Sequence, residues 1–413
     1  MMKLAGKRIL VVGMARSGVA AAQLLMHNGA IPVLSDRKKE NAFTHELDEL
    51  KGTACEFRLG EDPVVLLDSV DGLVISPGVP IDAPVVTAAR ENGVPMVGEL
   101  ELAASLLNGD MVAISGTNGK TTTTTLLGKI FENAGRVTHV AGNIGYPLSA
   151  VALESRKEDM TVVEVSSFQL ESIKTFHPHV AALLNITEDH LNRHGTMAQY
   201  IRLKQRIFEN QTANDYAVLN MDDPTLVKMV PKIKSQVAFF SRTQPVENGA
   251  FVDNGKIVWQ WQGARRAICD ADQILIPGPH NLENALAATA MACALGVPAP
   301  VIRHTLQSFT GVEHRIEKVR VFEGVTYIND SKGTNVDSTI KAVQSMKVPT
   351  VILLGGYDKH TDFMPLCREM ITSGMIAHAV VMGETSRQIR EQLEEAGYTA
   401  ITQAYSMQDA VDK

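Results

Sequence analysis

The chain has 413 residues, of which 45% are hydrophobic, and its formal net charge is −7 at pH 7. This length is enough for two or three domains, and the composition is typical of a globular protein. The negative charge argues against a nucleic-acid-binding or membrane-surface protein, because both need a basic face. It does not oppose the binding of anionic nucleotides, which are held locally.

The four cysteines, Cys55, Cys269, Cys293 and Cys367, are scattered and form no C-x-x-C pair. This pattern fits buried thiols in a reducing cytoplasm. The apolar run near the N-terminus is too short for a signal peptide, and no other apolar run could span a bilayer. We therefore expect a cytoplasmic monomer with no membrane insertion and no nucleic-acid partner.

The first part of the chain, residues 7–98, alternates between strand and helix patterns. We predict a helix over residues 17–28 and strands at residues 8–12, 32–35, 73–76 and 94–97. Alternation of this kind is typical of a small doubly wound α/β unit.

A glycine turn, Gly13-Met-Ala-Arg-Ser-Gly18, follows the first strand, and Asp36-Arg37 follows the second. The pair resembles a dinucleotide fingerprint with its acidic ribose ligand, although Ala15 stands where the second glycine is needed. The turn can still hold the diphosphate of a UDP-sugar, FAD or NAD, so a nicotinamide cofactor stays an alternative. Ser76-Pro-Gly78, after another strand, is a candidate second wall or an ordinary turn.

The most informative segment is Ser115-Gly-Thr-Asn-Gly-Lys-Thr121, between an apolar run at residues 111–114 and a helical pattern over residues 122–134. Strand, glycine-rich turn and helix in this order make a phosphate cradle at a helix N-terminus. Lys120 can reach the outer phosphates, and the Thr121 hydroxyl can ligate Mg²⁺. The first glycine of the full Walker pattern would fall on Ile114. The context nevertheless predicts ATP binding, with a tight turn and a solvated lysine as the alternative.

The remaining chain continues the α/β pattern without an internal repeat or a low-complexity linker. Strands are expected at residues 162–165, 180–184, 217–219, 238–240, 326–328, 350–354 and 379–382. A hairpin is expected over residues 251–261, and helices over residues 197–210, 281–295, 336–344 and 387–396. We predict an α/β protein with domain boundaries near residues 98 and 311.

Polar residues stand at several strand ends of the middle segment. Glu164 closes one strand and could ligate Mg²⁺ near Thr121, or pair with a buried lysine. His190, at the end of Asn185-Ile-Thr-Glu-Asp-His190, could be a metal ligand or a core histidine. Lys204 is by default a solvated lysine. The amides in His280-Asn-Leu-Glu-Asn284 could contact an adenine or cap the helix.

Together these motifs resemble the ordered motif set of the Mur ligases, and the resemblance covers essentially the whole chain. The segments that carry it are residues 117–121, Glu164-Val-Ser-Ser, residues 185–190, Lys204, His280-Asn-x-x-Asn284, His314-Arg315 and Asn329-Asp-Ser-Lys332. Within the family the resemblance is to the branch that adds D-glutamate. It rests on the N-terminal glycine turn with Asp36-Arg37, Ser76-Pro-Gly, Gly142-Asn-Ile-Gly145 and Leu354-Gly-Gly-Tyr-Asp-Lys359. The Asp-Asn-Pro-Arg motif of the diaminopimelate- or lysine-adding branch is absent.

The resemblance implies three domains. They are a Rossmann-like UDP-sugar-binding domain over residues 1–98, a central P-loop ATPase-like domain with a mostly parallel sheet over residues 99–311, and a Rossmann-like amino-acid and ATP domain over residues 312–413. It also implies an ATP-dependent ligase that adds D-glutamate to UDP-N-acetylmuramoyl-L-alanine through an acyl phosphate, in peptidoglycan synthesis. The implied cofactors are ATP and Mg²⁺, with Mn²⁺ as a substitute.

The resemblance also implies a role for individual residues. ATP would be bound by Gly116, Thr117, Asn118, Gly119, Lys120, Thr121, Thr122, Asn281, Asn284, Arg315 and Asp330. The UDP-sugar would be bound by Ser17, Gly18, Asp36, Arg37, Ser76, Gly78 and Asn143, and D-glutamate by Lys332, Thr334 and Lys359. Metal ions would be held by Thr121, Glu164, His190 and a carbamylated Lys204. The expected catalytic residues are Lys120, Glu164, His190, Lys204 and His314.

One departure concerns the end of the chain. Relatives in this family continue with a further strand and a Ser-Pro-Ala-x-x-Ser loop that touches D-glutamate, whereas this sequence ends at Ala410-Val-Asp-Lys413. We therefore expect an incomplete last domain. Two alternatives stay open at this point: another Mur-type amino-acid ligase, or a nucleotide-binding protein that lacks ligase turnover.

Overall fold

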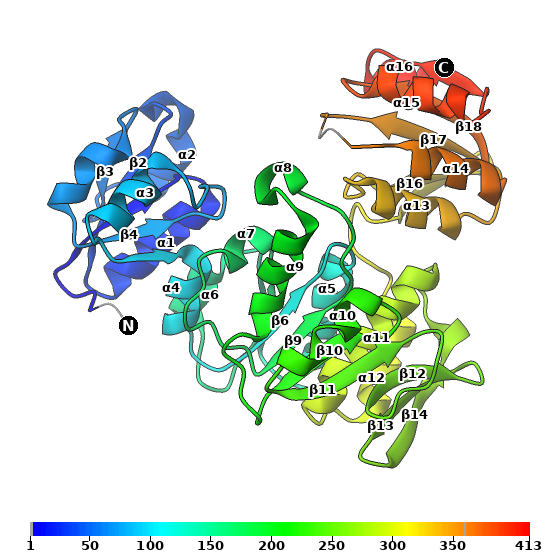
Figure 1. Ribbon diagram of the computed structural model, residues 1–413, viewed down its shortest axis with the longest axis horizontal. Coiled ribbons are helices and arrows are strands. Elements are labelled where there is room, and N and C mark those ends of the chain that lie inside the picture. Colours follow the sequence, from blue (N-terminus) through cyan, green and yellow to red (C-terminus); the bar gives the residue numbers. More distant parts are fainter. Residues whose placement is uncertain (1–2, 359–360) are drawn as a thin grey trace.

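The computed structural model describes residues 3–358 and 361–413. Figure 1 shows three successive lobes, coloured blue, cyan to yellow, and orange to red along the chain. Each lobe contains a sheet with mostly parallel strands, so the predicted α/β class is confirmed.

The first lobe is built on a five-stranded parallel sheet in the order β3-β2-β1-β4-β5. Its strands are β1 (Arg8–Val12), β2 (Ile31–Asp36), β3 (Glu56–Leu59), β4 (Gly72–Ile75) and β5 (Met96–Gly98). The helices are α1 (Arg16–His27), α2 (Thr44–Glu49) and α3 (Pro84–Glu91).

Successive residues of β1 point to opposite faces of this sheet. Ile9 and Val11 pack with α1, whereas Leu10 and Val12 pack with α3. Because helices cover both faces, the strands can be apolar throughout. The order of the strands reverses at β1, and ligands of such sheets bind beyond the carboxyl ends at this switch point.

The middle lobe contains a nine-stranded sheet in the order β14-β13-β12-β11-β10-β9-β6-β8-β7. Its strands are β6 (Asp110–Ser115), β7 (Thr138–Gly142), β8 (Met160–Glu164), β9 (Val180–Leu183), β10 (Tyr216–Asn220), β11 (Gln236–Ser241), β12 (Gly249–Asp253), β13 (Lys256–Trp261) and β14 (Ala264–Asp270). From β12 to β7 in this sheet order, β6 included, neighbouring strands pair in parallel. Strands β12, β13 and β14 pair antiparallel as two hairpins.

Two layers of helices cover the middle sheet. One layer shares a core with the even-numbered residues of β6 and consists of α5 (Lys120–Asn133), α11 (Pro279–Ala294) and α12 (Ala299–Ser308). The other contains α4 (Glu99–Leu106), α6 (Leu148–Glu154) and α9 (Met197–Gln205). Three helices of four residues connect strands to these layers: α7 (Ser167–Leu170), α8 (Leu191–His194) and α10 (Pro224–Val227). One hydrophobic cluster runs from α1 through α4 and α6, so the first two lobes share a packed contact.

The last lobe has two small sheets. Strands β15 (Glu317–Phe322) and β16 (Val325–Asn329) form an antiparallel hairpin. Strands β17 (Thr350–Gly355), β18 (Ile376–Met382) and β19 (Ile401–Gln403) form a parallel sheet. Its helices are α13 (Val336–Ser345), α14 (Met364–Ser373), α15 (Ser386–Glu395) and α16 (Met407–Asp412).

The predicted strands and helices are all found, with shifts at their ends. The helix expected over residues 197–210 ends at Gln205 and continues as a 3₁₀ turn, Arg206–Phe208. Strands β3, β7, β14, β15 and β19 were not predicted. Across residues 3–358 and 361–413, no helix combines the length and the apolar composition that crossing a membrane requires.

Gly18 packs directly against the first glycine turn, and this contact generates a stability prediction. A Cβ atom at Gly18 would lie 1.8 Å from the carbonyl oxygen of Gly13. Gly18→Ala must therefore open the turn, and we expect a loss of about 3 kcal/mol in unfolding free energy, measured by denaturant unfolding. Gly78→Ala is the control, because a Cβ there meets nothing within 4 Å. Equal stability of both variants would contradict the prediction.

Candidate active site at the carboxyl ends of the central strands

The phosphate loop joins the carboxyl end of β6 to the first turn of α5. Gly119 precedes the helix with a φ of 83°, a conformation that glycine adopts readily. A Cβ atom at this position would also lie 2.3 Å from Oδ1 of Asn284 on α11. Sterics and backbone conformation therefore both require glycine here, and the N-terminal amides of α5 stay accessible to an anion.

Asn185 holds the phosphate loop from the neighbouring strand β9. Its Oδ1 accepts the backbone N–H of Asn118 at 2.9 Å, and its Nδ2 donates to the carbonyl oxygen of Asn118 at 3.1 Å. Thr117 donates from its hydroxyl to the carbonyl oxygen of Thr187 at 3.0 Å. The loop is thus fixed by side chains from the motif at residues 185–190.

Two lysines converge on one carbonyl oxygen of this loop. The Nζ atoms of Lys120 and Lys204 donate to the oxygen of Gly116 at 3.0 and 2.8 Å. Lys204 is only 2% exposed, although lysine is almost never fully buried without a partner. Burial, together with the charge of Lys120, lowers the pKa of Lys204 well below its usual range. Burial also lowers the pKa of Lys120.

Glu164, at the end of β8, is 1% exposed and faces the phosphate loop. Its Oε2 accepts the Thr121 hydroxyl at 2.8 Å, and its Oε1 accepts Nδ2 of Asn143 at 2.9 Å. The structure therefore brings Thr121 and Glu164 together, as the sequence predicted. Asn143, expected to bind the UDP-sugar, orients the carboxylate in this arrangement.

His190 precedes α8 with a φ of 54°. Its Nε2 lies 3.5 Å from Oδ2 of Asp189, and its ring centroid lies 4.9 Å from that of Phe168. Among residues 3–358 and 361–413, no three His, Cys, Asp or Glu side chains gather as a preformed metal cage. The pair of Thr121 and Glu164 fits Mg²⁺ all the same, because this ion keeps several waters and takes further oxygens from phosphates.

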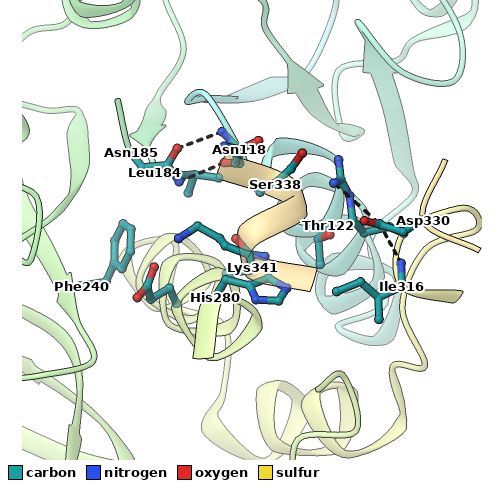
Figure 2. A pocket seen from close by; sticks show the side chains of 14 residues that line it. Asn118, Thr122, Leu184, Asn185, Phe240, His280, Ile316, Asp330, Ser338 and Lys341 are labelled. Atoms are coloured by element: carbon teal, nitrogen blue, oxygen red, sulfur yellow. Dashed lines mark hydrogen bonds and ion pairs between the residues drawn. The ribbon is translucent and has the colours of Figure 1, made fainter. Parts of the chain in front are cut away.

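A cleft of about 520 Å³ opens beside the phosphate loop (Figure 2). Six residues expected to bind ATP line it: Asn118, Gly119, Thr122, Asn284, Arg315 and Asp330. Asn281 does not line it; its Nδ2 donates to the oxygen of Pro277, and its Oδ1 accepts Nδ2 of Asn284. Asn281 thus orients the amide that faces the cleft.

Several residues that line the cleft were not predicted as site residues. Figure 2 shows His280 on α11 beside Lys341 on α13, with Phe240 at one end. Burial, and then the charges of Lys341 and Arg315, lower the pKa of His280 to about 4. This imidazole is therefore neutral at physiological pH. Only the fold could identify Phe240 and Lys341, because they come from distant segments, whereas His280 begins the motif at residues 280–284.

The start of α13 is hydrogen-bonded to the phosphate loop. Oδ2 of Asp337 accepts Nδ2 of Asn118 at 2.6 Å, and Nδ2 of Asn335 donates to Oδ1 of Asn118 at 3.3 Å. Arg315 lies 3.9 Å from Asp330, whose pKa is raised by burial despite that charge. The last lobe therefore supplies one wall of the cleft, and no motif in the sequence points to Asp337.

The expected D-glutamate residues lie around the loop after β16. The backbone N–H of Lys332 donates to the oxygen of His314 at 3.1 Å, and Nδ1 of His314 pairs with Asn329 at 2.8 Å. Thr334 is exposed on the same loop. Lys359 lies outside the described residues, so its predicted role stays a prediction.

The expected UDP-sugar residues gather at the carboxyl end of the first sheet. Oδ2 of Asp36 accepts the backbone N–H of Met14 at 3.0 Å, and the Ser76 hydroxyl donates to the oxygen of Gly13 at 3.1 Å. Ser17 lies in the first turn of α1, which begins at Arg16, and Arg37 and Gly78 are exposed nearby. These two hydrogen bonds hold the carboxyl ends of β2 and β4 against the turn that precedes α1.

A glycine-rich phosphate loop beside a cleft between two α/β lobes defines a nucleotide-binding enzyme. Residues 114–292 match the Mur ligase middle domain, and residues 7–98 match the Mur ligase MurD-like N-terminal domain. The UDP-N-acetylmuramoylalanine–D-glutamate ligase of Alkaliphilus oremlandii is 46% identical over 100% of this chain and 91% of its own length. The ligase of the same name from Clostridioides difficile is 43% identical over 99% of this chain and 90% of its own length. The chain therefore belongs to the Mur ligase family, among the UDP-N-acetylmuramoylalanine–D-glutamate ligases.

Solved structures agree on the fold. The UDP-N-acetylmuramate–alanine ligase MurC from Thermotoga maritima has a TM-score of 0.62 at 18% identity, over 97% of this chain and 91% of that one. MurF from Acinetobacter baumannii has a TM-score of 0.62 at 19% identity, over 99% of this chain and 83% of that one. At these identities the likeness concerns the fold alone.

Asn185 offers a test of the loop geometry. Asn185→Ala removes both hydrogen bonds to Asn118, each worth about 1 kcal/mol, and we expect the KM for ATP to rise about thirtyfold. Steady-state kinetics with varied ATP measures this change. Asn210→Ala is the matched control, because its amide also makes two 3.1 Å bonds to backbone oxygens, far from the cleft. An unchanged KM for ATP in Asn185→Ala would contradict the loop-holding role.

Proposed function

We propose that this chain joins D-glutamate to UDP-N-acetylmuramoyl-L-alanine and converts ATP to ADP and phosphate. The single observation that carries this proposal is the 43–46% identity to D-glutamate ligases over essentially the whole chain. The reaction belongs to the synthesis of peptidoglycan precursors. Membership of this family leaves the nicotinamide alternative for the first glycine turn without support.

The first step brings two anions together. The alanyl carboxylate of the UDP-sugar attacks the γ-phosphorus of ATP, ADP leaves, and an acyl phosphate forms. Such a step needs positioned cations, because the transferred phosphoryl group is itself negatively charged. Lys120 at the phosphate loop and Arg315, which lines the cleft, would supply them, with Thr117, Gly119 and neighbouring amides around the phosphates.

The second step forms the amide bond. The amine of D-glutamate attacks the acyl carbon, a tetrahedral intermediate forms, and phosphate leaves with the bonding electrons. A neutral amine is required, so a proton must be lost before or during the attack. Lys332, Thr334 and Lys359 would hold the two carboxylates of D-glutamate, and His314, bonded to Asn329, would stand beside the acceptor.

The metal sites belong to the proposal as well. Thr121, Glu164 and His190 would hold magnesium ions, and a carbamate on Lys204 would add an anionic oxygen. Bound magnesium would neutralise phosphate charge and stabilise the transferred phosphoryl group. Asn143 keeps the Glu164 carboxylate oriented, which supports this role. Manganese has the same oxygen preference and would substitute.

The remaining features are consistent with a cytoplasmic monomer, which we also propose. All four cysteines lie in the described part of the chain and are free thiols, as expected in a reducing compartment. Both substrates are small molecules. Size-exclusion chromatography with light scattering would decide the oligomeric state.

Phosphate release tests the function directly. Purified protein is incubated with ATP, Mg²⁺ and UDP-N-acetylmuramoyl-L-alanine, and D-glutamate, L-glutamate, L-alanine, L-lysine or meso-diaminopimelate is added separately. We expect stoichiometric phosphate and one new UDP-linked product with D-glutamate alone, identified by mass spectrometry. Turnover with another amino acid would assign a different Mur ligase. Binding of both nucleotides without any turnover would support the nucleotide-binding alternative.

Lys204 generates a prediction about its own modification. Carbamylation requires the neutral amine, and a lowered pKa makes Lys204 neutral at a lower pH than an ordinary lysine. We therefore expect [¹³C]bicarbonate to give one carbamate signal by ¹³C NMR near neutral pH, absent in Lys204→Ala. Activity of Lys204→Ala should fall at least about a hundredfold and be partly restored by a short carboxylic acid. A fully active protein without the signal would refute the modification.

A further inference from the structure

The short helix α8 cannot be stable on its own. It has four residues, far fewer than an isolated helix needs in water, and it begins after His190 in a left-handed backbone conformation. Its position must therefore come from side-chain contacts with the rest of the protein. The position of the His190 imidazole, which we propose to bind metal, depends on the same contacts.

Arg193, the third residue of α8, makes several of these contacts. Its Nη2 donates to Oε2 of Glu171 at 2.7 Å, and its Nε lies 3.4 Å from Oε1 of the same carboxylate. The guanidinium also lies over the ring of Phe168, 4.9 Å from its centroid. The same ring packs against His190, so Arg193 and His190 are held by one aromatic side chain.

The carboxylate of Glu171 is also held by the next residue, the last of α8. Nδ1 of His194 lies 3.4 Å from Oε1 of Glu171, and Nε2 of His194 lies 2.9 Å from the hydroxyl of Ser167. The side chains of Glu171 and His194 are 8% and 1% exposed. A carboxylate this deeply buried costs desolvation and keeps a fixed geometry only with full hydrogen bonding.

Arg193 also reaches the first lobe. Its Nη2 lies 3.4 Å from the carbonyl oxygen of Val79. Val79 ends the loop that carries Ser76 and Gly78, both expected to contact the UDP-sugar. A second cleft, of about 260 Å³, lies at this junction and is lined by Ser76, Val79, Phe168 and Glu171 among others. The planar guanidinium of Arg193 thus contacts the loop at residues 76–79, the buried carboxylate of Glu171, and the Phe168 ring that packs against His190.

We propose that Arg193 is a positioning residue that couples the loop at residues 76–79 to the imidazole of His190. Binding of the UDP end of the substrate fixes the position of this loop. Through Arg193 and Phe168, the loop then fixes the position of the His190 imidazole for the chemical step. This inference rests on the proposed function, because it takes the loop as the UDP-sugar site. Arg193, which lies outside the expected site, thereby couples occupancy of the UDP-sugar site in the first lobe to the middle lobe.

The test follows the His190 ring signal by ¹H–¹³C NMR, assigned with His190→Asn. UDP is the probe, because it fills the first-lobe site without carrying the muramoyl-alanyl group toward His190. In the unmodified protein we expect saturating UDP to shift the His190 signal. In Arg193→Ala we expect UDP still to bind, by calorimetry, while the shift is lost. We also expect kcat to fall about tenfold, within the range for residues that couple sites, with the KM for ATP unchanged.

Controls separate coupling from stability. Arg136→Ala removes a similar pair, 2.9 Å from Asp110 at the far end of β6, and should respond to UDP like the unmodified protein. Arg193→Lys keeps the positive charge but not the planar guanidinium, and should lose most of the UDP-dependent shift of the His190 signal. This variant replaces Arg193→Ala if Arg193→Ala does not fold. A normal shift in the folded Arg193 variant, or none in the unmodified protein with UDP bound, would overturn the proposal. Failure of UDP to bind would instead refute the proposed function.

Discussion

Two buried lysines share one carbonyl oxygen, and much of the site depends on this constraint. Lys120 and Lys204 both donate to Gly116, and like charges in one desolvated space oppose each other. The arrangement is stable when one of them gives up its charge. Lys204 is the more buried of the two, and burial together with the charge of Lys120 lowers its pKa well below the usual range for lysine. A neutral amine beside a phosphate site is also the form that can become a carbamate.

The phosphate loop is fixed from three directions. Asn185 holds it from β9, Glu164 faces it from β8, and Asp337 bonds it from the last lobe. Asn185 and Glu164 lie at the carboxyl ends of the parallel strands β9 and β8, where an open α/β sheet binds ligands, whereas Asp337 lies on α13 of the last lobe. The geometry therefore follows from topology: neighbouring strands bring distant sequence motifs to one edge.

The sequence predicted the fold class, the segments with strong strand and helix periodicity, and the contact of Thr121 with Glu164. It missed strands such as β15, whose residues are largely exposed, because burial on one face is what produces a clear alternation. It also missed Asp337 and Lys341. Their importance comes from a contact between lobes, and no local pattern records which surface a helix meets. For Asn281 the motif was recognised, but the amide that was predicted to contact adenine is hydrogen-bonded to Asn284 and does not line the cleft.

Coupling between lobes is the feature that ties these observations together. Asn335 donates both to Asn118 of the phosphate loop and to Asp189, the residue before His190. Arg193 contacts the first lobe from the helix that His190 begins. The segment at residues 189–193 is therefore contacted by both outer lobes, while its own short helix has little intrinsic stability. A ligase that must bring two anions together before an amine arrives benefits from such a segment. In the proposed mechanism, the imidazole would reach its working position only when both neighbours are in place, which would disfavour premature phosphoryl transfer to water.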